Sequence, residues 1–130
     1  MLASRISIAE QYSSRNAVWL TSSCCTRSLE RRGGLARRRG RFSCIVTYGS
    51  TRLHKPHGDP VVAGVVDLQL RPEDCVYVGD QPSDVIAGKA AGVGTVAVLW
   101  GFGDEEALRA AAPDTILSDP SKLISFIEQF

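Results

Sequence analysis

The chain has 130 residues, of which 44% are hydrophobic and 22% are charged, and this is ordinary for a single folded domain with an apolar core. No apolar run approaches the roughly 18 residues that a membrane-spanning helix needs, so we expect no membrane partner. The net charge of +1 hides a basic first part. Residues 1–55 hold 11 Lys or Arg and two acids, whereas residues 56–130 hold four Lys or Arg and 12 acids.

The four cysteines, Cys24, Cys25, Cys44 and Cys75, show neither a CxxC pair nor a metal-ligand spacing. We expect reduced thiols and a cytoplasmic location, since proteins of the cytosol rarely contain disulfides. The Ser- and Arg-bearing, acid-poor N-terminus also fits a mitochondrial transit peptide, which is the less favoured alternative.

The first half of the chain contains two runs typical of strands, Ala17–Leu20 and Phe42–Thr47. Short helices are predicted at residues 4–14 and at Cys25–Arg32. Two glycines that follow Arg32 are expected to end the second helix. A loop rich in glycine and proline, Tyr48–Pro60, follows the second strand.

The second half of the chain alternates strands and helices. Strands are predicted at Cys75–Val78, Thr95–Leu99 and Thr115–Leu117, and helices at Val61–Leu70, Pro82–Ala91, Asp104–Ala112 and from Asp119-Pro120 to about Gln129. The valines of Val61–Leu70 also favour a strand, but Asp59-Pro60 before them is a good helix start, so a helix is the preferred prediction. In the last helix, Leu123, Ile124 and Ile127 are expected to form the buried face.

This alternation predicts an α/β fold with a mostly parallel sheet and helices on both faces, a Rossmann-like three-layer α/β/α arrangement. Ligands of such sheets bind at the carboxyl ends of the strands. Those ends carry Thr21, the loop with Lys55, Asp80 with Asp84, and Trp100–Gly103. The two carboxylates follow a buried strand that breaks at glycine, which suits a hard cation such as Mg²⁺.

Three motifs converge at this edge: AVWLTSS with Thr21 and Ser22, HKPHGDP with Lys55, and VYVGDQPSD with Asp80 and Asp84. Together they resemble the haloacid dehalogenase (HAD) superfamily of phosphatases, in its phosphoglycolate-phosphatase-like branch. The resemblance covers nearly the whole chain. It implies Mg²⁺-dependent hydrolysis of a phosphate monoester through an aspartyl-phosphate intermediate, with a small phosphorylated metabolite as substrate.

The resemblance also implies a role for each matched residue. Thr21 and Ser22 would bind the phosphoryl oxygens, and Thr21 would stabilise their charge in the transition state. Lys55 would act beside Thr21 as a catalytic point charge on the phosphate. Asp80 would bind Mg²⁺ directly, while Asp84 would bind the ion or orient its waters.

The sequence departs from the family pattern in lacking the first motif, DxDGT, whose first aspartate is the nucleophile. No two aspartates of this chain have the DxD spacing. We therefore expect a single core domain over residues 1–130 without a cap domain, and a chain that is inactive alone. The central strand that carries the nucleophile, between the strands ending at Thr21 and Asp80, would be missing. The two neighbouring strands would then either keep unpaired backbone groups or close the gap. We therefore expect either marginal stability of the chain, or a complementing chain or self-association that covers the place of the missing strand.

Other functions are open to the same sequence. The first is a non-catalytic module, derived from this fold, that binds phosphate, metal or a partner. The second is nucleic-acid binding by the six arginines of Arg31–Arg41, but no aromatic side chains interleave them and we expect no nucleic-acid partner. A truncated gene or a misplaced start is the explanation that we favour for the missing motif.

Overall fold

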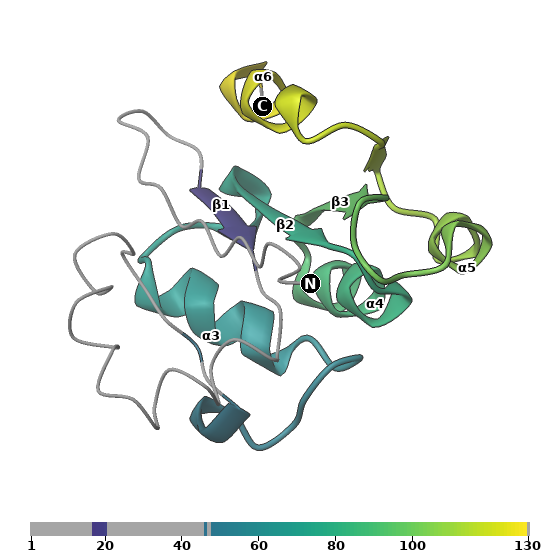
Figure 1. Cartoon of the computed structure of the whole chain (residues 1–130). Coiled ribbons are helices and arrows are strands. Elements are labelled where there is room, and N and C mark those ends of the chain that lie inside the picture. The colour runs from purple at the N-terminus through teal and green to yellow at the C-terminus, as the bar shows by residue number, and fades with distance from the viewer. Residues whose placement is uncertain (1–16, 21–45, 47, 130) are drawn as a thin grey trace, which may run out of the picture.

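The structure is a computed structural model that describes residues 17–20, 46 and 48–129 (Figure 1). Some predictions lie outside these residues: the helices at residues 4–14 and Cys25–Arg32, the phosphate ligands Thr21 and Ser22, and the strand Phe42–Thr47 apart from Val46, which lies in no helix or strand. Within the described part of the chain, none of the helices is both long and apolar enough to cross a membrane.

The described strands form one parallel sheet, as the alternation of elements predicts. Their order is β1 (Ala17–Leu20), β2 (Cys75–Gly79), β3 (Gly94–Val98) and β4 (Thr115–Leu117). β1 lies directly beside β2, with Leu20 opposite Val78. Of the two outcomes expected for the missing central strand, the described sheet therefore shows the second, in which the neighbouring strands close the gap and pair with each other.

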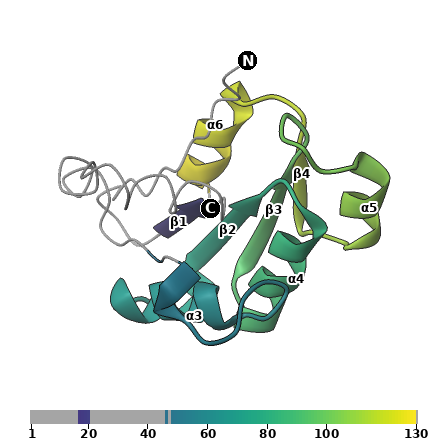
Figure 2. The same ribbon diagram turned by 60° about the horizontal axis from the view of Figure 1, so that its bottom comes forward.

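Helices cover both faces of the sheet (Figures 1 and 2). They are α3 (Asp59–Asp67), α4 (Pro82–Ala91), α5 (Glu105–Ala110) and α6 (Ser121–Gln129), with short 3-10 helices η2 (Tyr48–Ser50) and η3 (Pro72–Asp74) in the connections. On one face, α3 and α4 pack on β2 through Val61, Val65, Cys75, Tyr77, Ala87, Ala91 and Val93. On the other face, α6 closes a core of Val76, Val78, Val96, Val98, Leu117 and Leu123.

Local signals predict most boundaries of these elements well. α4 and β4 have the predicted bounds, and β3 is shifted by one residue. α3 begins two residues before the predicted start at Val61, because Pro60 fits the first turn of a helix. The helix ends at Asp67, short of the predicted Leu70, and Gln69 follows with a left-handed φ of 56° that interrupts the helical backbone.

The buried face predicted for α6 is wrong at one position. Leu123 is buried and Ile127 packs against the core, but the side chain of Ile124 is 62% exposed. Phe126 packs against the core in its place. A helix turns by about 100° per residue, so residues three and four positions after Leu123 share its face, whereas Ile124 points away from it.

A threonine–aspartate pair ties the start of β3 to the turn before β4. Thr95 is 1% exposed, and its backbone N–H and hydroxyl donate to Asp114 Oδ2 at 2.7 and 2.8 Å. The N–H of Asp114 donates in return to Thr95 Oγ1 at 3.1 Å. The bonds from the Thr95 hydroxyl and N–H lower the pKa of the Asp114 carboxyl below its usual value.

We expect Thr95→Val to lower the free energy of unfolding at pH 7 by about 1–2 kcal/mol, because it removes a hydrogen bond to a charged group. A carboxyl whose pKa is lower in the folded state contributes stability above its unfolded pKa, and this contribution is lost as the pH falls through the folded pKa. The variant should therefore lose less stability than the wild type between about pH 4 and pH 2. Urea denaturation across this range measures the difference, and parallel curves would contradict the role given to Asp114.

Candidate functional site

Asp80 is the first residue after β2, at the carboxyl end of the sheet, and a glycine-flanked loop holds it. The backbone N–H of Phe102 donates to Asp80 Oδ2 at 2.8 Å. A Cβ atom added to Gly101 would lie 2.3 Å from the Cβ of Asp80, and one added to Gly103 would lie 1.7 Å from the Asp80 carbonyl oxygen. The loop therefore needs both glycines to approach Asp80, and it fixes the orientation of the carboxylate.

Asp84 lies in the first turn of α4, and its side chain is 1% exposed. Its Oδ2 atom accepts the backbone N–H of Gln81 at 3.1 Å, which caps the start of the helix. Its Oδ1 atom accepts two donors, the ammonium group of Lys55 at 2.5 Å and the hydroxyl of Tyr77 at 3.4 Å. The sequence placed Lys55 and Asp84 at the same sheet edge, and the structure joins them in an ion pair.

Burial controls the electrostatics of this ion pair. It raises the pKa of Asp84 above the usual carboxyl value, although the charge and the hydrogen bond of Lys55 oppose this effect. Asp80 adds to the rise, because its negative charge disfavours a second one nearby. The side chain of Lys55 is only 15% exposed, so water screens the pair weakly.

The described residues offer one carboxylate that is suited to a direct contact with a metal ion. They contain no group of three or more His, Cys, Asp or Glu side chains that could hold a metal. Asp80 is partly exposed at the carboxyl end of β2, which suits an ion that keeps most of its waters. The oxygens of Asp84 already accept three protein donors. This arrangement fits Mg²⁺ on Asp80. The binding of the ion, or of its waters, by Asp84 stays a prediction.

Sequence reasoning missed three groups in this site: the Tyr77 hydroxyl, the Gln81 N–H and the Phe102 N–H. Two of them are backbone donors, which leave no trace in a sequence. The tyrosine did leave a signal, since a phenol in an otherwise apolar strand normally needs a hydrogen-bond partner. Phe102 itself is 75% exposed, whereas Trp100 is partly buried against the core.

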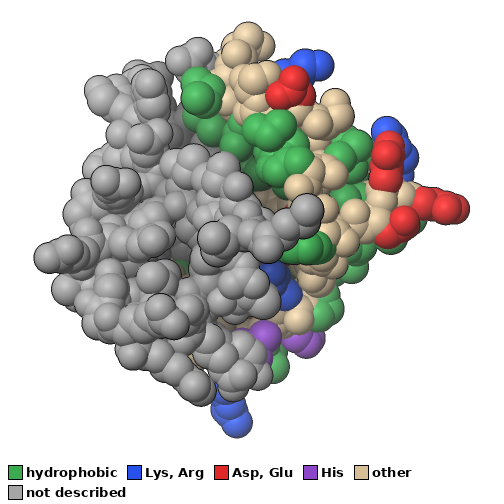
Figure 3. All heavy atoms as spheres, viewed as in Figure 1, with side chains coloured by type: hydrophobic (Ala, Val, Ile, Leu, Met, Phe, Trp, Pro, Cys, Tyr) green, Lys and Arg blue, Asp and Glu red, His purple; other side chains and the backbone are tan. Residues whose placement is uncertain are grey.

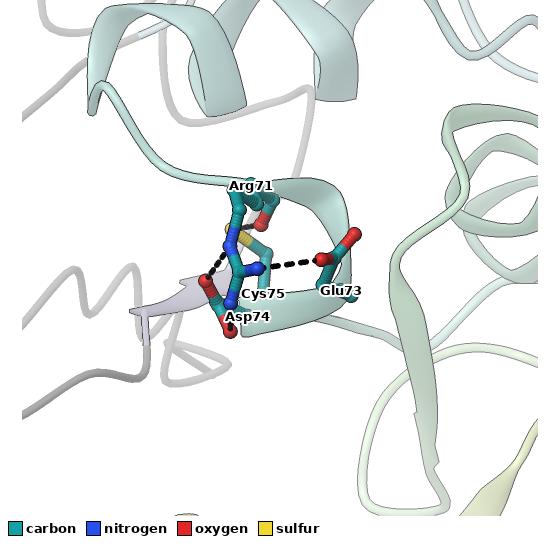
Figure 4. Close-up of polar contacts among 4 residues, drawn as sticks. All are labelled: Arg71, Glu73, Asp74 and Cys75. Atoms are coloured by element: carbon teal, nitrogen blue, oxygen red, sulfur yellow. Dashed lines mark hydrogen bonds and ion pairs between the residues drawn. The ribbon is translucent and has the colours of Figure 1, made fainter.

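A second polar cluster lies at the opposite end of β2 (Figure 4). The guanidinium group of Arg71 contacts Glu73 at 2.9 Å and Asp74 at 2.8 Å, and the Cys75 thiol donates to the Arg71 carbonyl oxygen at 3.3 Å. Burial, followed by the charge of Asp74, raises the pKa of the thiol, so the cysteine stays protonated. These exposed ion pairs contribute little to stability, and they join the connection before β2 to the strand.

The surface around α5 carries several exposed acidic side chains. Acidic side chains gather on the side of the molecule where α5 lies (Figure 3), and three consecutive acids, Asp104, Glu105 and Glu106, are exposed there. The guanidinium group of Arg109 pairs with Glu105 on the same helix, which compensates part of this negative charge. The arginines of Arg31–Arg41 lie outside the described residues.

The family model for haloacid dehalogenase-like hydrolases matches residues 26–98, which is more than half of the chain. The protein belongs to this family. The match includes the loop with Lys55, the carboxylates Asp80 and Asp84, and all of β3. The resemblance inferred from the three motifs is therefore confirmed.

Individual relatives agree with this membership. The chain is 36% identical over 86 residues to the pyrophosphatase PpaX of Anoxybacillus flavithermus, which covers 66% of this chain and 40% of that protein. It is 37% identical over 84 residues to the phosphoglycolate phosphatase of Xanthomonas campestris pv. campestris, which covers 62% of this chain and 38% of that protein. The HAD-family chain thus spans about two fifths of the length of these curated relatives.

Solved structures share the fold. A hydrolase from Pseudomonas syringae superposes with a TM-score of 0.68 at 22% identity, covering 85% of this chain and 50% of that one. A putative β-phosphoglucomutase from Thermotoga maritima also gives a TM-score of 0.68, at 24% identity, covering 86% of this chain and 51% of that one. These similarities confirm the Rossmann-like α/β fold.

Proposed function

We propose that this HAD-family chain carries the Mg²⁺- and phosphate-binding part of a phosphatase site, and that the 130 residues alone do not hydrolyse phosphate esters. The observation that carries this proposal is the buried Lys55–Asp84 ion pair, whose two residues lie at the sheet edge with Asp80. Two of the relatives are named as a pyrophosphatase and a phosphoglycolate phosphatase, so the ligand class is a small phosphorylated metabolite or pyrophosphate.

The charges of the described site explain why a cation is needed. Asp80 and Asp84 carry two negative charges against the single positive charge of Lys55, which leaves the three residues with an excess negative charge at pH 7. A phosphate dianion would be repelled from such a site. Mg²⁺, when bound, supplies the missing positive charge and polarises the phosphoryl group.

The protein groups then have separate tasks. Asp80, oriented by the Phe102 N–H, holds the cation, and Lys55, tethered to Asp84, donates to a phosphate oxygen. Thr21 and Ser22 stay predicted phosphate ligands. We further propose that a complementing polypeptide supplies the nucleophilic aspartate, because the 130 residues contain no DxD pair. A strand that brings this aspartate between β1 and β2 has to displace the direct pairing of these two strands. A cytoplasmic location stays a prediction.

The experiment compares the hydrolysis of p-nitrophenyl phosphate by the wild-type chain with that by Asp80→Asn, both in the presence of Mg²⁺. We expect neither protein to exceed the background rate. Calorimetric titration with Mg²⁺ should show binding to the wild type and to the control Asp67→Asn, whose carboxylate is exposed at the end of α3, and a loss of binding to Asp80→Asn. Hydrolysis by the wild type that Asp80→Asn abolishes would show a complete enzyme and overturn the proposal.

A non-catalytic binding module is the second candidate, because the same pair of carboxylates and lysine could hold a metal and an anion without chemistry. The two candidates differ in whether a complementing chain restores hydrolysis. If a separately produced HAD segment that contains the DxD motif restores hydrolysis, the chain is part of an enzyme. If binding persists and no such segment restores activity, the binding module is the better description.

A further inference from the structure

Tyr77 is a buried polar residue to which the proposed function gives no task. It lies in the middle of β2, three residues before Asp80, and is 1% exposed. Its hydroxyl is 3.4 Å from Asp84 Oδ1, the oxygen that also accepts the Lys55 ammonium group. Burial, together with the charge of Asp84, raises the pKa of the phenol well above its usual range, so the hydroxyl stays protonated and can donate.

The carboxylate of Asp84 is held from three directions, and each donor comes from a different element. Gln81 donates from the start of α4, Lys55 from the loop before α3, and Tyr77 from the sheet. Of the three donors, only the tyrosine lies in a strand that is paired on both sides. Because Asp84 is 1% exposed, water has little access to replace a lost donor.

The position of Lys55 depends on that carboxylate. Its side chain comes from a connection outside the helices and strands, and the contact with Asp84 fixes where the ammonium group lies. We infer that Tyr77 is a positioning residue for Lys55: its hydroxyl orients the Asp84 carboxylate, and the carboxylate places the ammonium group that meets a phosphate. The part of this inference that concerns phosphate rests on the proposed function, whereas the tether of Lys55 does not.

The test uses Tyr77→Phe, which keeps the ring and its packing and removes only the hydroxyl. Thr95→Val is the matched control, because it also removes a buried hydroxyl that donates to an aspartate, but at the start of β3 and bonded to Asp114. Lysines are modified with an amine-reactive ester at pH 8, and the rate at each lysine is followed by mass spectrometry. Lys89 and Lys122 serve as internal references.

We expect Lys55 to react about fivefold faster in Tyr77→Phe than in the wild type, the factor that corresponds to the loss of one ordinary hydrogen bond. The two reference lysines should keep their rates in Tyr77→Phe. Thr95→Val should leave the rates at Lys55 and Lys122 unchanged, whereas Lys89 is not a reference for this control because it interacts with Asp114. An unchanged rate at Lys55 in Tyr77→Phe would overturn the inference. A similar increase at Lys55 in both variants would also overturn it, since that would show a general loosening of the fold.

A second readout separates positioning from metal binding. In the presence of Mg²⁺, Tyr77→Phe should bind inorganic phosphate about fivefold more weakly than the wild type, while its affinity for Mg²⁺ stays within about twofold. Equal losses of both affinities would contradict a specific role toward Lys55. If the wild type binds no phosphate at all and Lys55 still reacts faster in Tyr77→Phe, the proposed function fails and the tether is supported.

Discussion

Replacing Lys55 by methionine should lower the free energy of unfolding by about 3–5 kcal/mol at pH 7, because it leaves the Asp84 carboxylate buried without its charged partner. Methionine keeps most of the apolar length of lysine, so the loss reports the charge and not the packing. The remaining donors, Tyr77 and Gln81, are neutral and cannot replace the ammonium group. Urea denaturation of both proteins at pH 7 measures the difference.

This deficit should shrink in acid. The charge and the hydrogen bond of Lys55 are the largest effects that lower the pKa of Asp84 against the effect of burial. Without Lys55, this pKa should therefore rise further above its unfolded value. A carboxyl with a raised folded pKa binds its proton more tightly in the folded state, so folding gains stability as the pH falls through that pKa. The stability of Lys55→Met should therefore approach that of the wild type between pH 7 and about pH 4.5.

The double variant Lys55→Met/Asp84→Asn is the control for this interpretation. An amide in place of the carboxylate removes the buried charge, so the double variant should be more stable than Lys55→Met alone. With the wild type and the single variant Asp84→Asn, the two variants complete a double-mutant cycle, whose interaction free energy measures the coupling of the pair. A loss below about 1 kcal/mol in Lys55→Met, the range of exposed ion pairs, would show that the pair is not buried in solution.

A methyl group at Gly103 should be the most damaging small change at the site. The added Cβ would lie 1.7 Å from the Asp80 carbonyl oxygen, so either the loop or Asp80 must move. We expect Gly103→Ala to lose about 3 kcal/mol or more of stability, at the upper end of the range for overpacking. It should also weaken Mg²⁺ binding, because the displaced loop no longer presents the Phe102 N–H to the Asp80 carboxylate.

Gly92→Ala provides the control for Gly103→Ala. Gly92 ends α4 with a left-handed φ of 75°, and an added Cβ would lie 3.8 Å from its nearest neighbour, a carbon of Pro72. This variant introduces backbone strain but no steric clash, so its free energy of unfolding should fall by about 1–2 kcal/mol and its Mg²⁺ affinity should stay the same. If the two variants lose the same stability and both keep the affinity, the loop does not hold Asp80.

Much of the fold could be predicted because its signals are local. Pro82 in the first turn and a glycine at the C-cap mark the two ends of α4, and turn residues bound β4. The buried face of α6 was wrong at Ile124 because hydrophobicity alone does not fix which face of a helix meets the sheet. The direct pairing of β1 with β2 was one of two outcomes that the sequence left open, since strand order is a tertiary property.

The site shows the same division between local and tertiary information. The spacing of Asp80 and Asp84 predicted that both carboxylates lie at the sheet edge, and Lys55 was expected there from its motif. Their different surroundings could not be predicted, since they depend on a phenol from β2 and on a backbone N–H from the loop after β3. As a result, Asp84 accepts bonds from Lys55, Tyr77 and Gln81, whereas the Phe102 N–H donates to one oxygen of Asp80.

The binding of inorganic phosphate to the 130-residue chain, measured calorimetrically with and without Mg²⁺, tests the proposed site most directly. Because Asp80, Asp84 and Lys55 together carry an excess negative charge, phosphate should bind the wild type only in the presence of Mg²⁺, and Asp80→Asn should abolish this Mg²⁺-dependent binding. Phosphate binding that is equally strong without Mg²⁺, or that Asp80→Asn retains in full, would contradict a metal-assisted phosphate site at this edge of the sheet.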